Sequence, residues 1–260
     1  MTAVAAAFED YLARLVDIAG GEPDVVGLVG FGSTADRSRV DEWSDHDFAW
    51  LTVPGAEDRY RHDLSWLPDA HRIALSVVES HGGVKVVYDD GHVLEFGIDS
   101  LDGFARWLGN RAEVLVDKGG VAEAVAAVLA KPVPGDGVVP EREIRLFFTQ
   151  LLIGVGRVRR GEVTNGSHMV RTEAVQHLLA AVAVRVAPAG DPMARDTLDV
   201  RRRLERVHPT IASAIEEAVR LDADTAARRL LDLAERELAP GWDGFPTAAV
   251  AAVRARLGWT

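Results

Sequence analysis

Hydrophobic positions in the first half of the chain follow two different periods. Short apolar runs bounded by Gly, Pro or Asp predict strands, and longer segments with an apolar residue at every third or fourth position predict helices. The predicted strands are residues 25–30, 46–53, 72–79, 84–88, 92–98 and 113–116. The predicted helices of this half are residues 2–19, 100–109 and 120–130.

In the second half, nearly every segment has the helical period. One apolar stripe consists of Ile144, Phe147, Phe148, Leu151, Leu152, Val155 and Val158, and further helices are predicted at residues 168–187, 196–206, 209–220, 223–237 and 246–257. Two prolines and two glycines in residues 131–137 interrupt any regular element between the halves. The pattern therefore predicts an α+β fold, with a mixed β-sheet flanked by helices in residues 1–134 and an α-helical bundle domain in residues 135–260.

Two aspartates, Asp45 and Asp47, stand where the second predicted strand begins. Residues i and i+2 of a strand project from the same face, so we expect the two carboxylates to lie side by side. Adjacent carboxylates repel each other, and a divalent cation allows both to stay ionised. Mg²⁺ suits such a pair and leaves its remaining positions to water and substrate phosphates. His46, between them, would face the other side, where a structural role is expected.

A glycine turn follows the first predicted strand and contains Gly32 and Ser33. Glycine permits the backbone angles of a tight turn and exposes backbone N–H groups, and the serine adds a hydroxyl donor. We therefore expect Gly32 and Ser33 to bind phosphate. Each motif is common by itself, and their order and spacing carry the prediction.

Gly32-Ser33, an eleven-residue spacer and Asp45-His46-Asp47-Phe48 together resemble the signature of the DNA-polymerase-β-like nucleotidyltransferase superfamily, most closely its aminoglycoside and lincosamide (antibiotic) nucleotidyltransferases. The resemblance covers about residues 25–99. It implies the nucleotidyltransferase fold and the transfer of a nucleoside monophosphate, AMP from ATP, to a hydroxyl group of a small molecule, with release of pyrophosphate. It also implies that Asp45 and Asp47 bind one or two Mg²⁺ ions.

The same family carries a third acid on a later strand, and Glu95 is the candidate here. Asp89-Asp90-Gly91 predicts a hairpin turn before the strand that contains Glu95. Glu95 and Gly97 would share one face of that strand, opposite its packed apolar face. In the family this acid completes the metal site or takes the proton of the attacking hydroxyl. Asp99 has the same strand parity and is the alternative.

The helical half offers further candidates. Arg160, at the end of a predicted helix, would contact the nucleotide phosphates, although its position near a helix C-terminus is also explained by the helix dipole. Glu141 and Glu143, at the start of that helix, could bind the acceptor or serve as base instead of Glu95. Favourable interaction with the positive end of the helix explains them as well.

Composition excludes several classes of function. The chain has 260 residues and no cysteine, so disulfides, zinc–thiolate sites and cysteine nucleophiles are excluded. The apolar runs are too short to span a membrane. The first residues lack the pattern of a secretory signal. We therefore expect cytoplasmic residence and no membrane partner.

The net charge of −11 is unevenly distributed. Residues 1–135 carry 11 Lys/Arg and 23 Asp/Glu, which gives −12, and residues 136–260 carry 18 and 17, which gives +1. An acidic first half argues against a nucleic-acid acceptor, because binding to a phosphate backbone needs basic residues. It favours a cationic small acceptor, although an acidic surface also serves solubility. The expected partners are thus a nucleoside triphosphate and a small hydroxylated molecule, and the sequence leaves open whether a homodimer completes the site.

Two other functions fit the same motifs. One is a nucleotidyltransferase of the toxin or antitoxin type, which modifies a protein or an RNA. The other is a nucleotide-binding module without turnover. The large helical half disfavours the first, and the retained acids disfavour the second.

Overall fold

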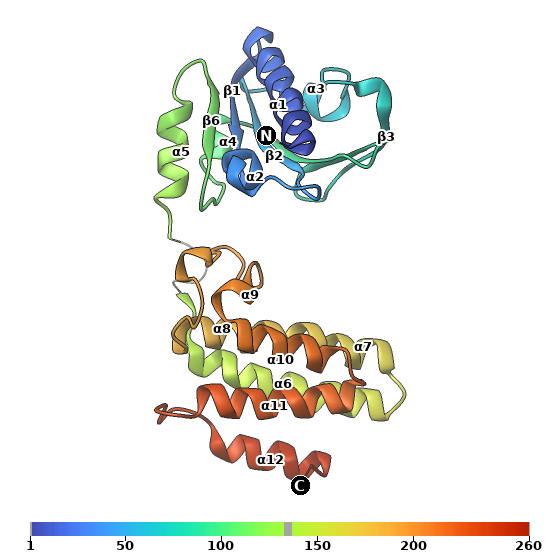
Figure 1. Ribbon diagram of the computed structural model, residues 1–260, viewed down its shortest axis with the longest axis vertical. Helices are drawn as coiled ribbons and strands as arrows, with labels where there is room; N and C mark the ends of the chain where they lie inside the picture. Colours follow the sequence, from blue (N-terminus) through green and yellow to red (C-terminus); the bar gives the residue numbers. More distant parts are fainter. Residues whose placement is uncertain (1, 133–136, 260) are drawn as a thin grey trace. The chain divides into compact units, whose positions relative to one another are not determined.

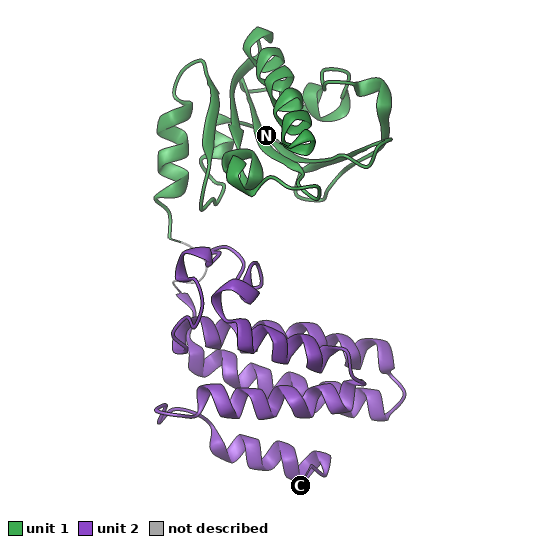
Figure 2. Ribbon diagram, viewed as in Figure 1, with its two compact units in different colours: residues 1–132 green, residues 133–260 purple. Residues whose placement is uncertain are grey.

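The computed structural model describes residues 2–132 and 137–259 of the chain. The chain divides into two compact units, residues 1–132 and 133–260, shown in different colours in Figure 2. Residues 133–136, in the segment where the sequence predicts the domain boundary, lie outside the described residues.

Unit 1 contains a six-stranded mixed sheet (Figure 1) with the order β3-β4-β5-β2-β1-β6. The strands are β1 (Val25–Gly30), β2 (His46–Thr52), β3 (Ile73–Val78), β4 (Val84–Tyr88), β5 (Val93–Ser100) and β6 (Glu113–Asp117). The central pair, β2 and β5, is parallel, and the other neighbouring strands are antiparallel.

Helices cover both faces of this sheet. The helices of unit 1 are α1 (Ala3–Gly21), α2 (Gly32–Ala35), α3 (Glu57–His62), α4 (Leu101–Phe104) and α5 (Val121–Leu129). Side chains of α1 and α3 pack on one face with Phe48 and Trp50 of β2. Side chains of α4 and α5 pack on the other face with Ala49 and Leu51. β2 is therefore apolar at successive positions because both of its faces are covered.

Unit 2 is helical and has one apolar core. Its helices are α6 (Pro140–Arg159), α7 (Val163–His168), α8 (Val175–Arg185), α9 (Leu204–Val207), α10 (Pro209–Val219), α11 (Ala223–Leu238) and α12 (Thr247–Leu257), and a π-helical segment (Met169–Ala174) joins α7 to α8. Most of the predicted apolar stripe of α6 is fully buried, namely Ile144, Phe147, Phe148, Leu151 and Val155. The predicted α+β class, a mixed sheet flanked by helices and followed by a helical region, is confirmed.

Two predicted helices were wrong in extent. The helix predicted at 100–109 ends at Phe104, and most of residues 196–206 are not helical. In the second case, the Asp196 carboxylate accepts hydrogen bonds from the backbone N–H groups of Leu198 and Asp199, so the side chain competes with the helical hydrogen bonds. Arg203 also has a positive φ of 60°, which interrupts a helix. No helix within residues 2–132 or 137–259 has the length and apolar character needed to cross a membrane.

The core of unit 2 can be tested at Phe147. The substitution Phe147→Ala removes a fully buried ring, and we expect it to lower the free energy of unfolding by about 3–5 kcal/mol. The control is Arg145→Ala, an exposed position of the same helix. Urea denaturation followed by circular dichroism measures both variants. A loss at Phe147 no larger than that at Arg145 would contradict the assigned packing.

Candidate active site

Asp47 and Glu95 lie side by side in the sheet. In the parallel pairing of β2 with β5, Asp47 is the register partner of Glu95, and neighbouring strands are about 4.8 Å apart. Both residues line one cleft with a volume of about 390 Å³. The structure therefore brings together two of the three acids that the sequence predicts.

Lys85 extends this row of charged side chains onto a third strand. It is the register partner of Glu95 in β4, and its Nζ lies 3.7 Å from Glu95 Oε1. The same Nζ lies 3.2 Å from Oε1 of Glu79. The hydrogen bond to the Glu79 carboxylate, together with the charge of Glu95, holds the pKa of Lys85 above its usual range. Lys85 was not predicted from the sequence, although counting back from the predicted hairpin turn pairs it with Glu95.

Two hydrogen bonds hold the Gly32 turn next to Asp47. The Phe31 N–H donates to the Asp47 carbonyl oxygen at 2.8 Å, and the Asp47 N–H donates to Thr34 Oγ1 at 3.0 Å. Gly32 has a positive φ of 51°, and a Cβ placed on it would lie 3.6 Å from Asp47 Oδ2. Phe31 and Thr34 thus hold the turn beside the Asp47 carboxylate. Neither was singled out in the sequence.

Ser33 already has a partner inside the protein. Its Oγ donates to the carbonyl oxygen of Asp45 at 3.2 Å, and Ser33 is buried. This bond links the turn to the chain segment that enters β2. The structure thus places Ser33 next to the predicted site with its hydroxyl oriented toward Asp45.

Asp45 lines a different hollow of the protein. It precedes β2 and borders a groove of about 700 Å³ that is also lined by residues of α1 and by His92. Burial lowers the pKa of His92, and the nearby Asp45 carboxylate acts in the opposite direction. Strand pairing begins at His46, so the alternation expected for Asp45 and Asp47 does not extend to Asp45. Within residues 2–132 and 137–259, no group of three or more His, Asp or Glu side chains is placed to hold a metal ion.

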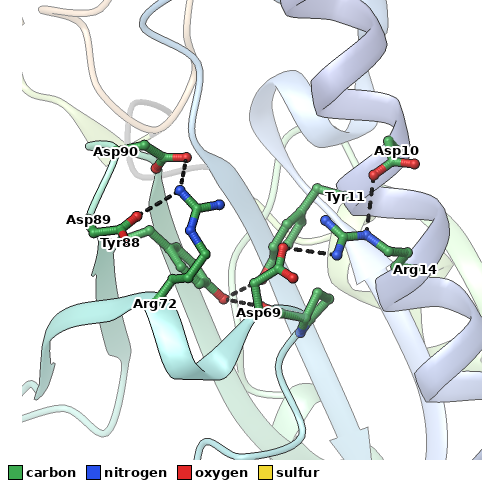
Figure 3. Close-up of polar contacts among 9 residues, drawn as sticks. Asp10, Tyr11, Arg14, Asp69, Arg72, Tyr88, Asp89 and Asp90 are labelled. Carbon is green, nitrogen blue, oxygen red and sulfur yellow. Dashed lines mark hydrogen bonds and ion pairs between the residues drawn. The ribbon is translucent and has the colours of Figure 1, made fainter.

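Several side chains that line this groove are joined by polar contacts (Figure 3). Arg72 pairs with Asp89 at 2.6 Å and with Asp90 at 2.8 Å, at the hairpin turn between β4 and β5. Arg14 of α1 pairs with Asp69 at 2.9 Å and with Asp10 at 3.2 Å. Beside them, the Tyr88 hydroxyl donates to the Pro68 carbonyl oxygen at 2.8 Å and lies 2.9 Å from the Tyr11 hydroxyl. These contacts join α1 to the sheet, and they explain Asp89 and Asp90 as structural residues.

His46 belongs to the core under α1. Its side chain is 1% exposed, and its ring stacks on Phe8 with a centroid distance of 3.8 Å. Nε2 lies 3.0 Å from the Phe8 carbonyl oxygen, which only accepts hydrogen bonds, so Nε2 carries the proton. Nδ1 then accepts from His92 Nε2 at 2.8 Å. Burial lowers the pKa of His46 to about 3, and His92 acts in the same direction. His46 is therefore a neutral structural residue.

Asp99, the alternative third acid, is committed to two other groups. Its Oδ2 accepts from the Trp107 indole N–H at 3.2 Å, and its Oδ1 accepts from the Ser100 N–H at 2.9 Å. Asp99 lines the same cleft as Glu95. Of the two, Glu95 is the one that stands opposite Asp47.

The predicted residues of the helical half all belong to unit 2. Arg160 follows the end of α6, is exposed, and pairs with Glu162 at 3.3 Å. Glu143 is largely buried, and its Oε2 lies 2.7 Å from His177 Nδ1. Glu141 lies in the first turn of α6 and is half-buried. Their predicted roles at the nucleotide or the acceptor stay predictions.

The donor atoms in the cleft fit Mg²⁺. Asp47 and Glu95 present carboxylate oxygens, the hard ligands that this ion prefers, and two carboxylates leave positions for water and phosphate. The two residues come from rigid paired strands, which fixes the separation of their Cα atoms.

Comparisons with known proteins identify no family. No protein-family model matches the chain. No curated protein matches it either. Among solved structures, an aminoglycoside 6-adenyltransferase from Bacillus subtilis aligns with a TM-score of 0.33 and 9% sequence identity, over 97% of this chain and 92% of that chain. A likeness at this level does not bear on activity or on individual residues.

The state of His46 predicts how stability depends on pH. The unfolded chain binds a proton at His46 below pH 6.5, whereas the folded protein does so only near pH 3. Between these values the unfolded state binds more protons, so stability falls as the pH falls, by about 1.4 kcal/mol per pH unit from this residue. Urea denaturation across this range should show that the substitution His46→Gln removes this part of the slope. His71→Gln, at an exposed position, should keep it, and equal slopes in both variants would refute the assignment.

Proposed function

We propose that this chain is a Mg²⁺-dependent nucleotidyltransferase. It would transfer a nucleoside monophosphate, AMP from ATP, to a hydroxyl group of a small molecule and release pyrophosphate. The observation that carries the proposal is the register of β2 and β5, which sets Asp47 opposite Glu95 in one cleft. The Gly32 turn is hydrogen-bonded to Asp47. A phosphate bound at the turn would therefore lie close to a Mg²⁺ ion held by the two carboxylates.

Each residue of the cleft has a proposed role. Asp47 and Glu95 would hold Mg²⁺, which supplies neutralisation of the triphosphate charge and activation of the attacking hydroxyl. Gly32 and Ser33 would bind the β- and γ-phosphates, mainly through the backbone N–H groups of the turn, because the Ser33 hydroxyl donates to Asp45. In the alternative role that the sequence leaves open, Glu95 would accept the proton of the acceptor hydroxyl instead of binding the metal.

Three further contributions follow from the sequence and are part of the proposal. Asp45 would add a second aspartate to the metal site. Arg160 would contact the phosphates, and the helical domain, residues 135–260, would close the substrate cleft. The proposed site of action is the cytoplasm.

The acceptor would be a small hydroxylated molecule, such as an aminoglycoside- or lincosamide-like antibiotic, and the protein would then confer resistance. The cleft carries the carboxylates Asp47, Glu79, Glu95 and Asp99. Their charge favours a cationic acceptor. Lys85 offsets part of this charge at Glu79 and Glu95.

One observation favours the alternative of a nucleotide-binding module without turnover. Asp45 lines the groove next to His92 rather than the cleft that holds Asp47. In that case ATP would bind and no pyrophosphate would be released with any acceptor.

A pyrophosphate-release assay with Mg²⁺ and ATP tests the proposal, with aminoglycosides, lincosamides and other hydroxylated metabolites as acceptors. We expect release with at least one acceptor. The substitutions Asp47→Asn and Glu95→Gln should each lower the rate by about 100-fold or more, because each removes a charge that the transition state needs. The matched control is Asp17→Asn, the same chemical change at an exposed position of α1.

Unchanged circular dichroism spectra would show that these variants fold. Near-normal turnover of the Asp47→Asn variant would contradict the proposed mechanism. ATP binding without pyrophosphate release across all acceptors would establish the module without turnover.

A further inference from the structure

Trp107 lies across β5 next to the candidate site. A Cβ placed on Gly97 would come within 2.0 Å of Trp107 Cη2, so the indole occupies the space that any other side chain at residue 97 would fill. Gly97 is two residues beyond Glu95 and shares its face of the strand. Its register partner in β2 is Ala49, another small residue. The indole therefore packs against the sheet beside Glu95.

The same indole also contacts the chain segment that leads into the Gly32 turn. The rings of Trp107 and Phe31 are stacked, with a centroid distance of 6.3 Å and an interplanar angle of 27°. Phe31 immediately precedes Gly32, and its N–H donates to Asp47. Because β2 lies between β1 and β5 in the sheet, the Trp107 side chain connects two parts of the site that come from strands that are not neighbours.

Several contacts fix the indole in this place. Its N–H donates to Asp99 Oδ2 at 3.2 Å. A Cβ placed on Gly103 would lie only 1.5 Å from Asp99 Oδ1, so the Asp99 carboxylate occupies the space that a side chain at residue 103 would fill. Lys131, beyond the end of α5, donates to the carbonyl oxygen of Trp107 at 2.8 Å. Asp99, Gly103 and Trp107 thus pack against one another on the cleft side of the sheet.

We propose that Trp107 is a positioning residue that sets the distance between the Gly32 turn and the Glu95 carboxylate. This inference rests on the proposed nucleotidyl transfer. The turn would hold the phosphates and Glu95 would face the acceptor hydroxyl, so the distance between them controls how the reacting groups are aligned. A misplacement of about 1 Å can lower a rate by about 100-fold. Asp99 then serves to orient the indole and has no direct part in the chemistry.

The contact between Gly97 and Trp107 provides a specific test. The substitution Trp107→Ala should lower kcat for pyrophosphate release by about 100-fold, with KM for the acceptor changed much less. Gly97→Ala should have a similar effect in the wild-type background, because its methyl group must push the indole away. In the Trp107→Ala background, Gly97→Ala should add little, because the clash is gone, and such non-additivity identifies the contact as the cause.

The control is Trp259→Ala in unit 2. Trp259 is buried, and its indole N–H donates to Asp224 Oδ1 at 2.9 Å, so its loss removes a similar tryptophan–aspartate contact. We expect this variant to lose stability and keep kcat. Thermal melting of all the variants separates loss of folding from loss of alignment.

Three outcomes would overturn the inference. An active Trp107→Ala variant with wild-type kcat would refute the positioning role and leave the proposed function intact. Additive losses from Gly97→Ala and Trp107→Ala would show that their contact is not what aligns the site. A wild-type protein without pyrophosphate release would refute the proposed function, and the positioning role with it.

Discussion

The parallel pairing of β2 with β5 is the constraint on which the rest of the site depends. These strands are joined through β3 and β4, and their register decides which side chains meet. A shift of one residue would move Glu95 to the packed face and Phe96 into the cleft. The register is held because Phe48, the partner of Phe96, stacks on it at 4.7 Å in the core on the other face. Apolar packing on one face thus fixes the separation of two carboxylates on the opposite face.

Small residues give the cleft its form. Gly97 leaves room for Trp107, and Gly103 leaves room for the Asp99 carboxylate that holds the indole. Gly32 takes a positive φ that other residues rarely adopt. Each of these glycines is required by its conformation or its neighbours. They allow a large aromatic ring and a tight turn to lie within contact distance of the same strand pair.

Much of the fold follows from the sequence, because strand and helix periods are strong local signals. The strands, the long helices of unit 2, and the shared strand face of Glu95 and Gly97 were all predictable in this way. The placement of Asp45 was not, because alternation holds only inside a paired strand and β2 begins one residue later. The pairing of β2 with β5 also lies beyond local pattern, since it depends on the packing of both sheet faces. Trp107 was missed because its segment has the helical period, whereas the helix ends at Phe104 and the Trp107 side chain packs against Gly97.

Asp47 and Glu95 are expected to bind a divalent cation together in the presence of a nucleotide. Crystals grown with Mn²⁺, which takes the same oxygen ligands as Mg²⁺, and a non-hydrolysable ATP analogue would locate the ion by its anomalous scattering. We expect a peak bonded to carboxylate oxygens of both Asp47 and Glu95, with the triphosphate against the Gly32 turn. A bound nucleotide whose Mn²⁺ contacts neither carboxylate would contradict it.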